Sequence, residues 1–136
     1  MRVVGVDLGS KRIGVAVSDP SGTVATPHSV VQRTGSHTSD HRAIIAVVDE
    51  YEAELLVVGL PRSLDGSLGP AAEAALAEVE ELAGALDVPV ETVDERLTTV
   101  SADRALRASN VRGEARRQVV DKVAAAILLQ SWLDGG

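Results

Sequence analysis

The first part of the chain consists of short apolar runs, rich in Val and Ile, that are separated by polar turns. This pattern predicts three β-strands, at Arg2 to Leu8, Ile13 to Ser18 and Thr23 to Val31. The turns between them, Gly9 to Arg12 and Asp19 to Gly22, are too short for a parallel crossover, which needs about a dozen residues or more. We therefore expect an antiparallel meander.

The rest of the chain alternates stretches of helical periodicity with shorter apolar runs. Thr34 to Asp40 is a polar loop, and the apolar stripe after it predicts a helix with Ser39 or Asp40 as its N-cap. The continuous apolar run Leu55 to Leu60 is typical of a central strand that is buried on both faces. The further predicted elements are a loop at Pro61 to Ser67, a helix at Pro70 to about Leu86, a strand at Pro89 to Asp94, and helices at Thr99 to Ser109 and Glu114 to Leu133.

This element order, three strands followed by alternating helices and strands, indicates the α/β class. It predicts a mixed five-stranded sheet, in which an antiparallel three-strand meander is followed by parallel strands, with helices on both faces. Doubly wound folds and α/β barrels are excluded, because neither begins with three meandering strands. No linker or repeat interrupts the pattern, so we expect a single domain over residues 1–136.

The amino-acid composition excludes several classes of function for this chain. The 136 residues are 45% hydrophobic and 24% charged, values close to the globular average that exclude general disorder. The absence of cysteine excludes thiol catalysis, zinc–thiolate sites and iron–sulfur clusters, and it fits a reducing compartment. The sequence has neither a signal-peptide pattern nor an apolar run of about twenty residues, so we expect a cytoplasmic protein that does not enter membranes.

The chain is acidic overall, but its charges are segregated along the sequence. The net charge of −7 argues against a general nucleic-acid coat protein. Between Asp49 and Glu95 there are 13 acidic residues and one basic residue, whereas from Arg96 to Lys122 there are seven basic and three acidic residues. This segregation predicts either a basic face that contacts nucleic acid or only a pair of solvated helices. With one Tyr, one Trp and no Phe, a base-stacking platform is excluded.

Acidic residues occupy several positions where a carboxylate is costly. Asp7 interrupts the apolar first strand, Asp94 and Glu95 end the last one, and Asp121 lies at the edge of the apolar stripe of the final helix. Carboxylates that meet at one end of a sheet repel one another unless a cation is present. Oxygen ligands favour Mg²⁺ or Mn²⁺, and a pair of such ions can activate water and stabilise the leaving oxygen in phosphodiester hydrolysis, the two-metal type of nuclease. Each acid taken singly is better explained as a turn, a cap or a solvated edge, and spacing does not choose between Asp94 and Glu95.

The Gly-rich segment Gly5 to Ala16 has neither the P-loop nor the dinucleotide-binding glycine pattern. It is either a plain hairpin turn or a turn whose Lys11 and Arg12 contact a phosphate. His37 and His41 are four residues apart, but no third ligand follows at zinc-site spacing, so we interpret both as surface residues. The sequence also lacks the nucleophile elbow of serine hydrolases.

Four blocks of sequence, in order along the chain, resemble one protein family. They are Gly5 to Asp19, Val57 to Pro61 with Asp65-Gly66-Ser67, Asp94 to Thr99, and Asp121 to Ala125 with the helix to Leu133. On these residues the chain is similar to the YqgF/RuvX family, bacterial proteins of RNase H-like fold. Members of this family are described as Holliday junction resolvases and as the nuclease that matures the 5′ end of 16S ribosomal RNA.

The resemblance implies a metal-dependent nuclease of RNase H-like fold. It implies that Asp7, Glu95 and Asp121 are the catalytic acids and bind Mg²⁺ or Mn²⁺, so that Glu95 is chosen over Asp94. The residues expected to contact the substrate are Lys11, Arg12, Arg96, Arg104, Arg107, Arg112, Arg116 and Arg117.

The expected substrate is structured RNA, namely precursor 16S ribosomal RNA, with the precursor ribosomal particle as a partner. One alternative is a resolvase of branched DNA, which needs a homodimer to cut two strands symmetrically. A second alternative is a non-catalytic RNA- or protein-binding module of the same fold. Net acidity favours the module, whereas the placement of the three acids favours the nuclease, and both a monomer and a homodimer remain open.

Overall fold

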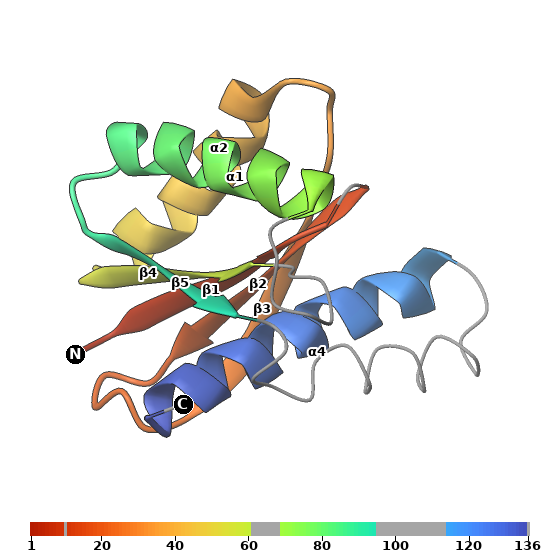
Figure 1. Ribbon diagram of the computed structural model, residues 1–136. Helices are drawn as coiled ribbons and strands as arrows, with labels where there is room; N and C mark the ends of the chain where they lie inside the picture. The colour runs from red at the N-terminus through yellow and green to blue at the C-terminus, as the bar shows by residue number, and fades with distance from the viewer. Residues whose placement is uncertain (10, 61–68, 95–113, 136) are drawn as a thin grey trace.

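The computed structural model describes residues 1–9, 11–60, 69–94 and 114–135, and the elements follow the predicted order (Figure 1). The described strands are β1 (Val3–Leu8), β2 (Arg12–Ser18), β3 (Ala25–Gln32), β4 (Leu55–Leu60) and β5 (Val90–Asp94). The described helices are α1 (His37–Glu50), α2 (Pro70–Ala85) and α4 (Glu114–Leu133). Of these helices, none has the length and apolarity needed to cross a membrane. The predicted loop at Pro61 to Ser67 and the predicted helix at Thr99 to Ser109 lie outside the described residues.

The strands form one mixed sheet in the order β3-β2-β1-β4-β5. β2 pairs antiparallel with both β1 and β3, whereas β4 pairs parallel with both β1 and β5. The predicted topology is thus confirmed, and β4 is buried along its whole length as its apolar run indicates. Because β1, β4 and β5 run parallel, their carboxyl ends lie at the same edge of the sheet, where α/β proteins commonly place their sites.

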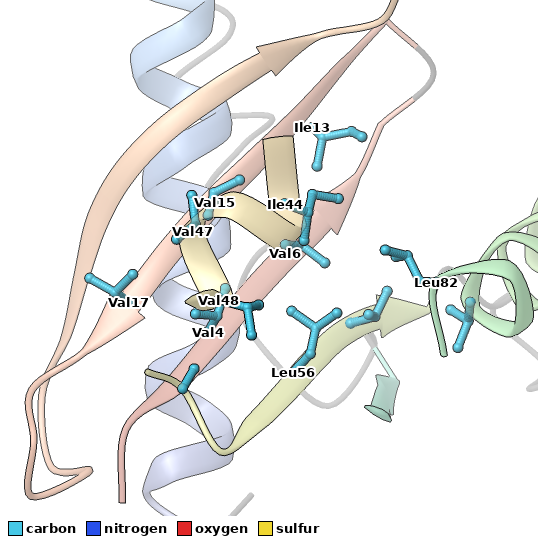
Figure 2. Close-up of a cluster of buried hydrophobic side chains, with 13 residues drawn as sticks. Val4, Val6, Ile13, Val15, Val17, Ile44, Val47, Val48, Leu56 and Leu82 are labelled. Carbon is cyan, nitrogen blue, oxygen red and sulfur yellow. The ribbon is translucent and has the colours of Figure 1, made fainter. Parts of the chain in front are cut away.

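Helices cover both faces of the sheet, as predicted (Figure 1). On one face, called here the α1–α2 face, Ile44 of α1 and Leu82 of α2 are buried against Val6 and Leu56 (Figure 2). On the opposite face, the α4 face, the core consists mainly of Ala124, Ala125, Leu128 and Leu129 of α4 with Val3, Ala16, Val57 and Val93 of the sheet. Since side chains alternate along a strand, each residue of the central strands belongs to one face or the other.

α4 lies close to the sheet because glycines line the strand surface beneath it. A Cβ atom added to Gly14 would lie 2.2 Å from the backbone oxygen of Asp121. A Cβ atom added to Gly5 would lie 2.8 Å from the Cβ of Leu129. Both separations are shorter than van der Waals contact, so only glycine fits at these positions without moving the helix. The two contacts lie about 12 Å apart along the axis of α4, and together they fix where the helix lies on the sheet.

α1 begins earlier than predicted, and the predicted N-cap is wrong. The N-cap is Ser36, whose hydroxyl accepts a hydrogen bond from the amide of Ser39 at 3.3 Å. Asp40 lies in the first turn of the helix instead. Its carboxylate accepts hydrogen bonds from the amide (3.0 Å) and the hydroxyl (2.8 Å) of Thr34. Ser and Asp are both favourable N-caps, so local preference left the choice open and the contact with Thr34 decided it.

Asp19 organises the turn between β2 and β3. Its carboxylate accepts hydrogen bonds from the hydroxyl of Ser21 and from the amides of Thr23 (2.7 Å) and Val24 (3.0 Å). These bonds keep both amides in the turn, so β3 begins at Ala25, two residues later than predicted. The same hydrogen bonds, led by the one from Ser21, lower the pKa of Asp19 to about 2.

We expect Gly14→Ala to destabilise the protein, because the added methyl group meets the backbone of α4. Overpacking of this kind costs about 3 kcal/mol, measured as the free energy of unfolding in urea. Gly84→Ala on α2 is the matched control, since nothing lies within 4 Å of its added Cβ. The better helix propensity of alanine should make that variant more stable, by up to about 1 kcal/mol. Wild-type stability of Gly14→Ala would contradict the close packing of α4.

Asp19→Asn should lower the melting temperature at pH 7, where the wild-type carboxylate is ionised and fully hydrogen-bonded. Because the folded pKa of about 2 lies below the ordinary 3.8, the stability that Asp19 contributes is lost as the pH falls through this interval. Melting curves followed by circular dichroism should therefore converge for variant and wild type between about pH 4 and pH 2. Glu91→Gln, an exposed position of β5, serves as the control. A difference in melting temperature that stays constant over this range would be evidence against the role of Asp19.

Candidate active site

Asp7 lies near the carboxyl end of β1, and only 4% of it is exposed. Its register partners on the two neighbouring strands are Gly14 of β2 and Gly59 of β4. Residues in register share a face of the sheet, and the position of a Cβ on Gly14 faces α4. The carboxylate of Asp7 is therefore on the α4 face. With glycine in register on both sides, neither neighbouring position adds a side chain beside this carboxylate.

Asp121 reaches the same end of the sheet from α4. Its backbone oxygen lies against Gly14, the register partner of Asp7. Its side chain is 18% exposed, and the carboxylate accepts a hydrogen bond from Nε of Arg12 at 2.6 Å. Arg12 precedes Gly14 by two residues on β2 and is therefore on the same face. The structure thus brings Asp7, Arg12 and Asp121 to one end of the α4 face.

Arg12 and Asp121 form an ion pair, which the sequence did not predict. The sequence predicts a phosphate contact for Arg12 and a metal ion for Asp121, whereas the two side chains contact each other in the structure. The guanidinium supplies a positive charge to a largely buried carboxylate, and it also offsets the negative charge that Asp7 adds nearby. A charge-assisted bond of this kind fixes the Asp121 side chain at the end of the sheet.

Because side chains alternate along β5, Asp94 points away from this site. Val93, the residue before it, packs in the core of the α4 face. Asp94 itself is in register with Leu60, which packs against α2. Asp94 therefore lies on the α1–α2 face, opposite to Asp7. Glu95, the acid that the family resemblance implies, is outside the described residues, so its place in the site stays a prediction.

The basic residues that we expect to contact substrate are described only in part. Lys11 is exposed in the turn before β2, at the same end of the sheet as Arg12. Arg116 and Arg117 belong to the beginning of α4, where the structure describes the backbone alone. The remaining predicted contacts, outside the described residues, are Arg96, Arg104, Arg107 and Arg112.

The carboxylates of Asp7 and Asp121 fit a small divalent cation. Both offer oxygen ligands, and the chain has no cysteine thiolate that would favour a softer metal. Asp7 is buried on a face made mostly of apolar side chains, where a carboxylate is costly unless an opposite charge or strong hydrogen bonds accompany it. This donor set is therefore of the type that holds Mg²⁺ or Mn²⁺.

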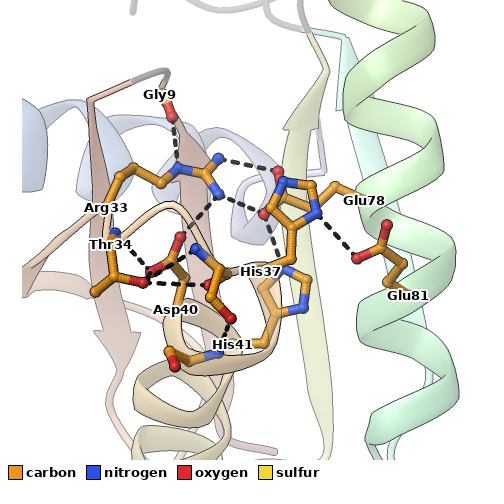
Figure 3. Close-up of polar contacts among 10 residues, drawn as sticks. Gly9, Arg33, Thr34, His37, Asp40, His41, Glu78 and Glu81 are labelled. Atoms are coloured by element: carbon orange, nitrogen blue, oxygen red, sulfur yellow. Dashed lines mark hydrogen bonds and ion pairs between the residues drawn. The ribbon is translucent and has the colours of Figure 1, made fainter.

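A second polar cluster lies on the α1–α2 face, and the sequence analysis missed it (Figure 3). We call it the His41 cluster, and it consists of Arg33, His37, Asp40, His41, Glu78 and Glu81. His41 is only 4% exposed, so its interpretation as a surface residue is wrong, whereas the side chain of His37 is 51% exposed. Nε2 of His41 lies 2.7 Å from Oε2 of Glu78, which is 37 residues away along the chain. The four-residue spacing of the histidines was the only local signal, because the third member comes from another helix.

Arg33 connects the His41 cluster to the turn between β1 and β2. Its guanidinium donates to Glu78 through Nη1 (2.6 Å) and Nη2 (2.9 Å), and its Nε donates to the carbonyl of Gly9 at 3.0 Å. Its backbone amide donates to the carbonyl of Lys11, also at 3.0 Å. The bonds to Glu78 raise the pKa of Arg33. Burial raises the pKa of Glu78, but the bonds from Arg33 and His41 outweigh burial, so the net pKa lies below its ordinary value.

The sequence matches one family over almost its whole length. The family model described as "RuvX: Holliday junction resolvase" covers residues 1–135. A protein of Nocardia farcinica (strain IFM 10152) is 51% identical over 139 residues, which cover 98% of this chain and 77% of the relative. A protein of Pelotomaculum thermopropionicum is 47% identical over 134 residues, which cover 98% and 87% of the two chains. Both relatives bear the name "Putative pre-16S rRNA nuclease".

The fold resembles that of two solved structures of one protein. The structure described as "T. thermophilus RuvC in complex with Holliday junction substrate" aligns with a TM-score of 0.58 at 20% identity, over 99% of this chain and 94% of RuvC. A second Thermus thermophilus RuvC structure gives a TM-score of 0.57 at 18% identity. At this identity the likeness establishes the shared RNase H-like fold, as predicted. The family model and the relatives at about 50% sequence identity also establish the family: this chain belongs to the RuvX family.

Proposed function

We propose that the protein is a metal-dependent nuclease, formed by one domain over residues 1–136, that hydrolyses phosphodiester bonds in precursor 16S ribosomal RNA. The observation that carries the proposal is the buried carboxylate of Asp7, flanked in register by two glycines, at the end of β1 where α4 delivers Asp121. The names of the relatives at 47–51% identity support the choice of substrate. A binding module would have no need for two carboxylates at this place.

In this proposal Asp7, Asp121 and Glu95 hold Mg²⁺ or Mn²⁺, which supplies an activated water and stabilises negative charge at the scissile phosphate. The fixed position of α4 on Gly5 and Gly14 sets where the Asp121 carboxylate is presented. The buried backbone of β1 likewise sets the position of the Asp7 carboxylate. Asp7 and Asp121 are therefore positioned before substrate binds, so that little reorganisation is needed during the reaction.

Arg12 has two partners in the proposed cycle. In the structure it neutralises Asp121. With a cation bound to Asp121, the guanidinium of Arg12 would be available to a phosphate oxygen at the same end of the sheet, next to the exposed Lys11. The arginines between 96 and 117, as predicted substrate contacts, would add positive charge for the RNA backbone and locally offset the net charge of −7. The protein acts in the cytoplasm, where ribosomal precursors are assembled.

Branched DNA is a second candidate substrate. The family model is described as a Holliday junction resolvase, and the RuvC structure with a similar fold contains a Holliday junction. This function requires a homodimer, so that two active sites cut the two strands symmetrically. The oligomeric state in solution therefore separates the two candidates, together with the substrate that is cut.

Asp7→Asn should abolish cleavage while leaving the fold intact, because the amide keeps the shape of the side chain but loses the charge that binds a cation. A metal contact worth several kcal/mol predicts a loss on the order of 1,000-fold in rate. The assay uses a precursor 16S leader, single-stranded RNA, duplex DNA and a four-way junction, each with Mg²⁺, Mn²⁺ or EDTA. Asp94→Asn is the matched control, since that carboxylate lies on the opposite face. Full activity of Asp7→Asn, or cleavage in EDTA, would refute the proposal.

Arg12→Gln should separate metal binding from substrate binding. Without the competing guanidinium, the Asp121 carboxylate is more available, so the Mn²⁺ concentration for half-maximal activity should fall. The loss of a charge-assisted contact with phosphate should weaken substrate binding by about tenfold or more, measured as KM or as Kd on the Asp7→Asn background. If both quantities stay at their wild-type values, Arg12 has only a structural role.

A further inference from the structure

The His41 cluster contains a set of side chains that the proposed nuclease function does not use. His37 and His41 lie one turn apart on α1, and Glu78 approaches them from α2 (Figure 3). One ligand atom from each of these three side chains lies within 4.8 Å of the other two. His41 and Glu78 are buried, and only His37 is open to solvent. Two imidazoles and a carboxylate thus converge on one point between two helices.

The charges of this cluster are not balanced by its one guanidinium. Arg33 contacts Glu78 at 2.6 Å and Asp40 at 3.5 Å. A third carboxylate, from Glu81, lies 3.0 Å from Nδ1 of His37. With neutral imidazoles the cluster therefore carries an excess of negative charge, part of it buried. Such an excess is relieved either by protonation of an imidazole or by a bound cation.

The ligand types select the kind of cation. Histidines four residues apart on one helix present both rings on one side, the spacing used by zinc-binding helices. Two imidazole nitrogens with one carboxylate oxygen make a His₂Glu set, which zinc sites use with a further ligand or water in the fourth position. Imidazole disfavours Mg²⁺, which takes oxygen ligands, and suits Zn²⁺. The site therefore differs in chemistry from the carboxylates at Asp7.

The distances permit this coordination with small side-chain movements. Zinc–ligand bonds of about 2.0–2.1 Å place tetrahedral ligand atoms about 3.3 Å apart. Nε2 of His41 and Oε2 of Glu78 are 2.7 Å apart, at hydrogen-bond distance, so an ion between them would separate the two atoms slightly. The remaining adjustment falls to His37, whose side chain is 51% exposed and therefore less confined by packing than His41 or Glu78.

The surrounding side chains resemble the outer sphere of a metal site. Metal-bound imidazoles commonly donate their second N–H to a carboxylate, and Glu81 accepts from Nδ1 of His37 at 3.0 Å when that nitrogen is protonated. This tautomer leaves the lone pair of Nε2 for an ion. Arg33 contacts both oxygens of Glu78, Oε1 through Nη2 at 2.9 Å and Oε2 through Nη1 at 2.6 Å. The carboxylate is thereby oriented with Oε2 directed at His41, 2.7 Å away.

We propose that His37, His41 and Glu78 bind one Zn²⁺ ion, with water as the fourth ligand. The ion links α1 to α2, and it lies on the face of the sheet opposite to Asp7. Through Glu78 and Arg33 it also supports the backbone of Gly9, in the turn that follows β1. This inference does not rest on the proposed nuclease function, because no residue of the site belongs to the α4 face.

Isothermal titration of the full chain, first stripped with EDTA, should show one equivalent of Zn²⁺ bound in the presence of excess Mg²⁺. The test variant is His37→Gln, whose half-exposed position allows the fold to persist, and we expect at least about 100-fold weaker binding. His28→Gln is the matched control, because this third histidine lies on β3 and contacts Ser29 and Tyr51 instead. No Zn²⁺ binding by the wild type, or equal binding by both variants, would overturn the proposal.

Two further measurements locate the ion. Co²⁺ in place of Zn²⁺ should give the visible absorption bands of a tetrahedral nitrogen–oxygen site in the wild type and in His28→Gln, but not in His37→Gln. Asp7→Asn should bind Zn²⁺ as the wild type does. If Asp7→Asn loses the Zn²⁺ equivalent, the ion belongs to the other face and the assignment to the His41 cluster is wrong. Saturating Zn²⁺ should also raise the melting temperature of the wild type, since only the folded chain brings α1 and α2 together.

Discussion

The contact between the backbone oxygen of Asp121 and the bare α-carbon of Gly14 determines how close α4 comes to the sheet. A side chain at Gly14 would push the helix outward and move the Asp121 carboxylate away from Asp7. The same closeness occurs again at Gly5, under Leu129. These glycines are therefore needed for their small size, and the geometry of the candidate active site depends on them directly.

The turn between β1 and β2 is held from both faces of the sheet. On the α4 face, Arg12 at the start of β2 is bound to the carboxylate of Asp121. On the α1–α2 face, Arg33 binds the carbonyls of Gly9 and Lys11. Two arginines thus contact the two sides of this short turn, and both are bound by carboxylates from helices. Removing one partner of such a pair leaves a charge in a poorly solvated place, which makes these contacts important for conformation even where their net stabilisation is small.

The two faces differ in the chemistry that they offer to cations. The α4 face presents carboxylate oxygens beside an arginine, which suits a small cation and a phosphate. The α1–α2 face presents imidazoles with one carboxylate, which suits zinc. This division follows from the layers of the fold, because α4 covers one face of the sheet whereas α1 and α2 cover the other. It explains how a short acidic chain can keep two groups of charged side chains apart with only the thickness of a sheet between them.

The fold could be predicted from the sequence because it depends on local information: turn lengths too short for parallel crossovers, the continuous apolar run of β4, and the periodicity of the helices. The choice of Asp7 and Asp121 was also accessible, since carboxylates in apolar patterns are conspicuous. The tertiary structure alone decided the pairing of Arg12 with Asp121, the face on which Asp94 lies, and the burial of His41 beside Glu78. Each of these joins residues that are far apart along the chain or depends on the register between strands, and neither local propensity nor spacing carries that information.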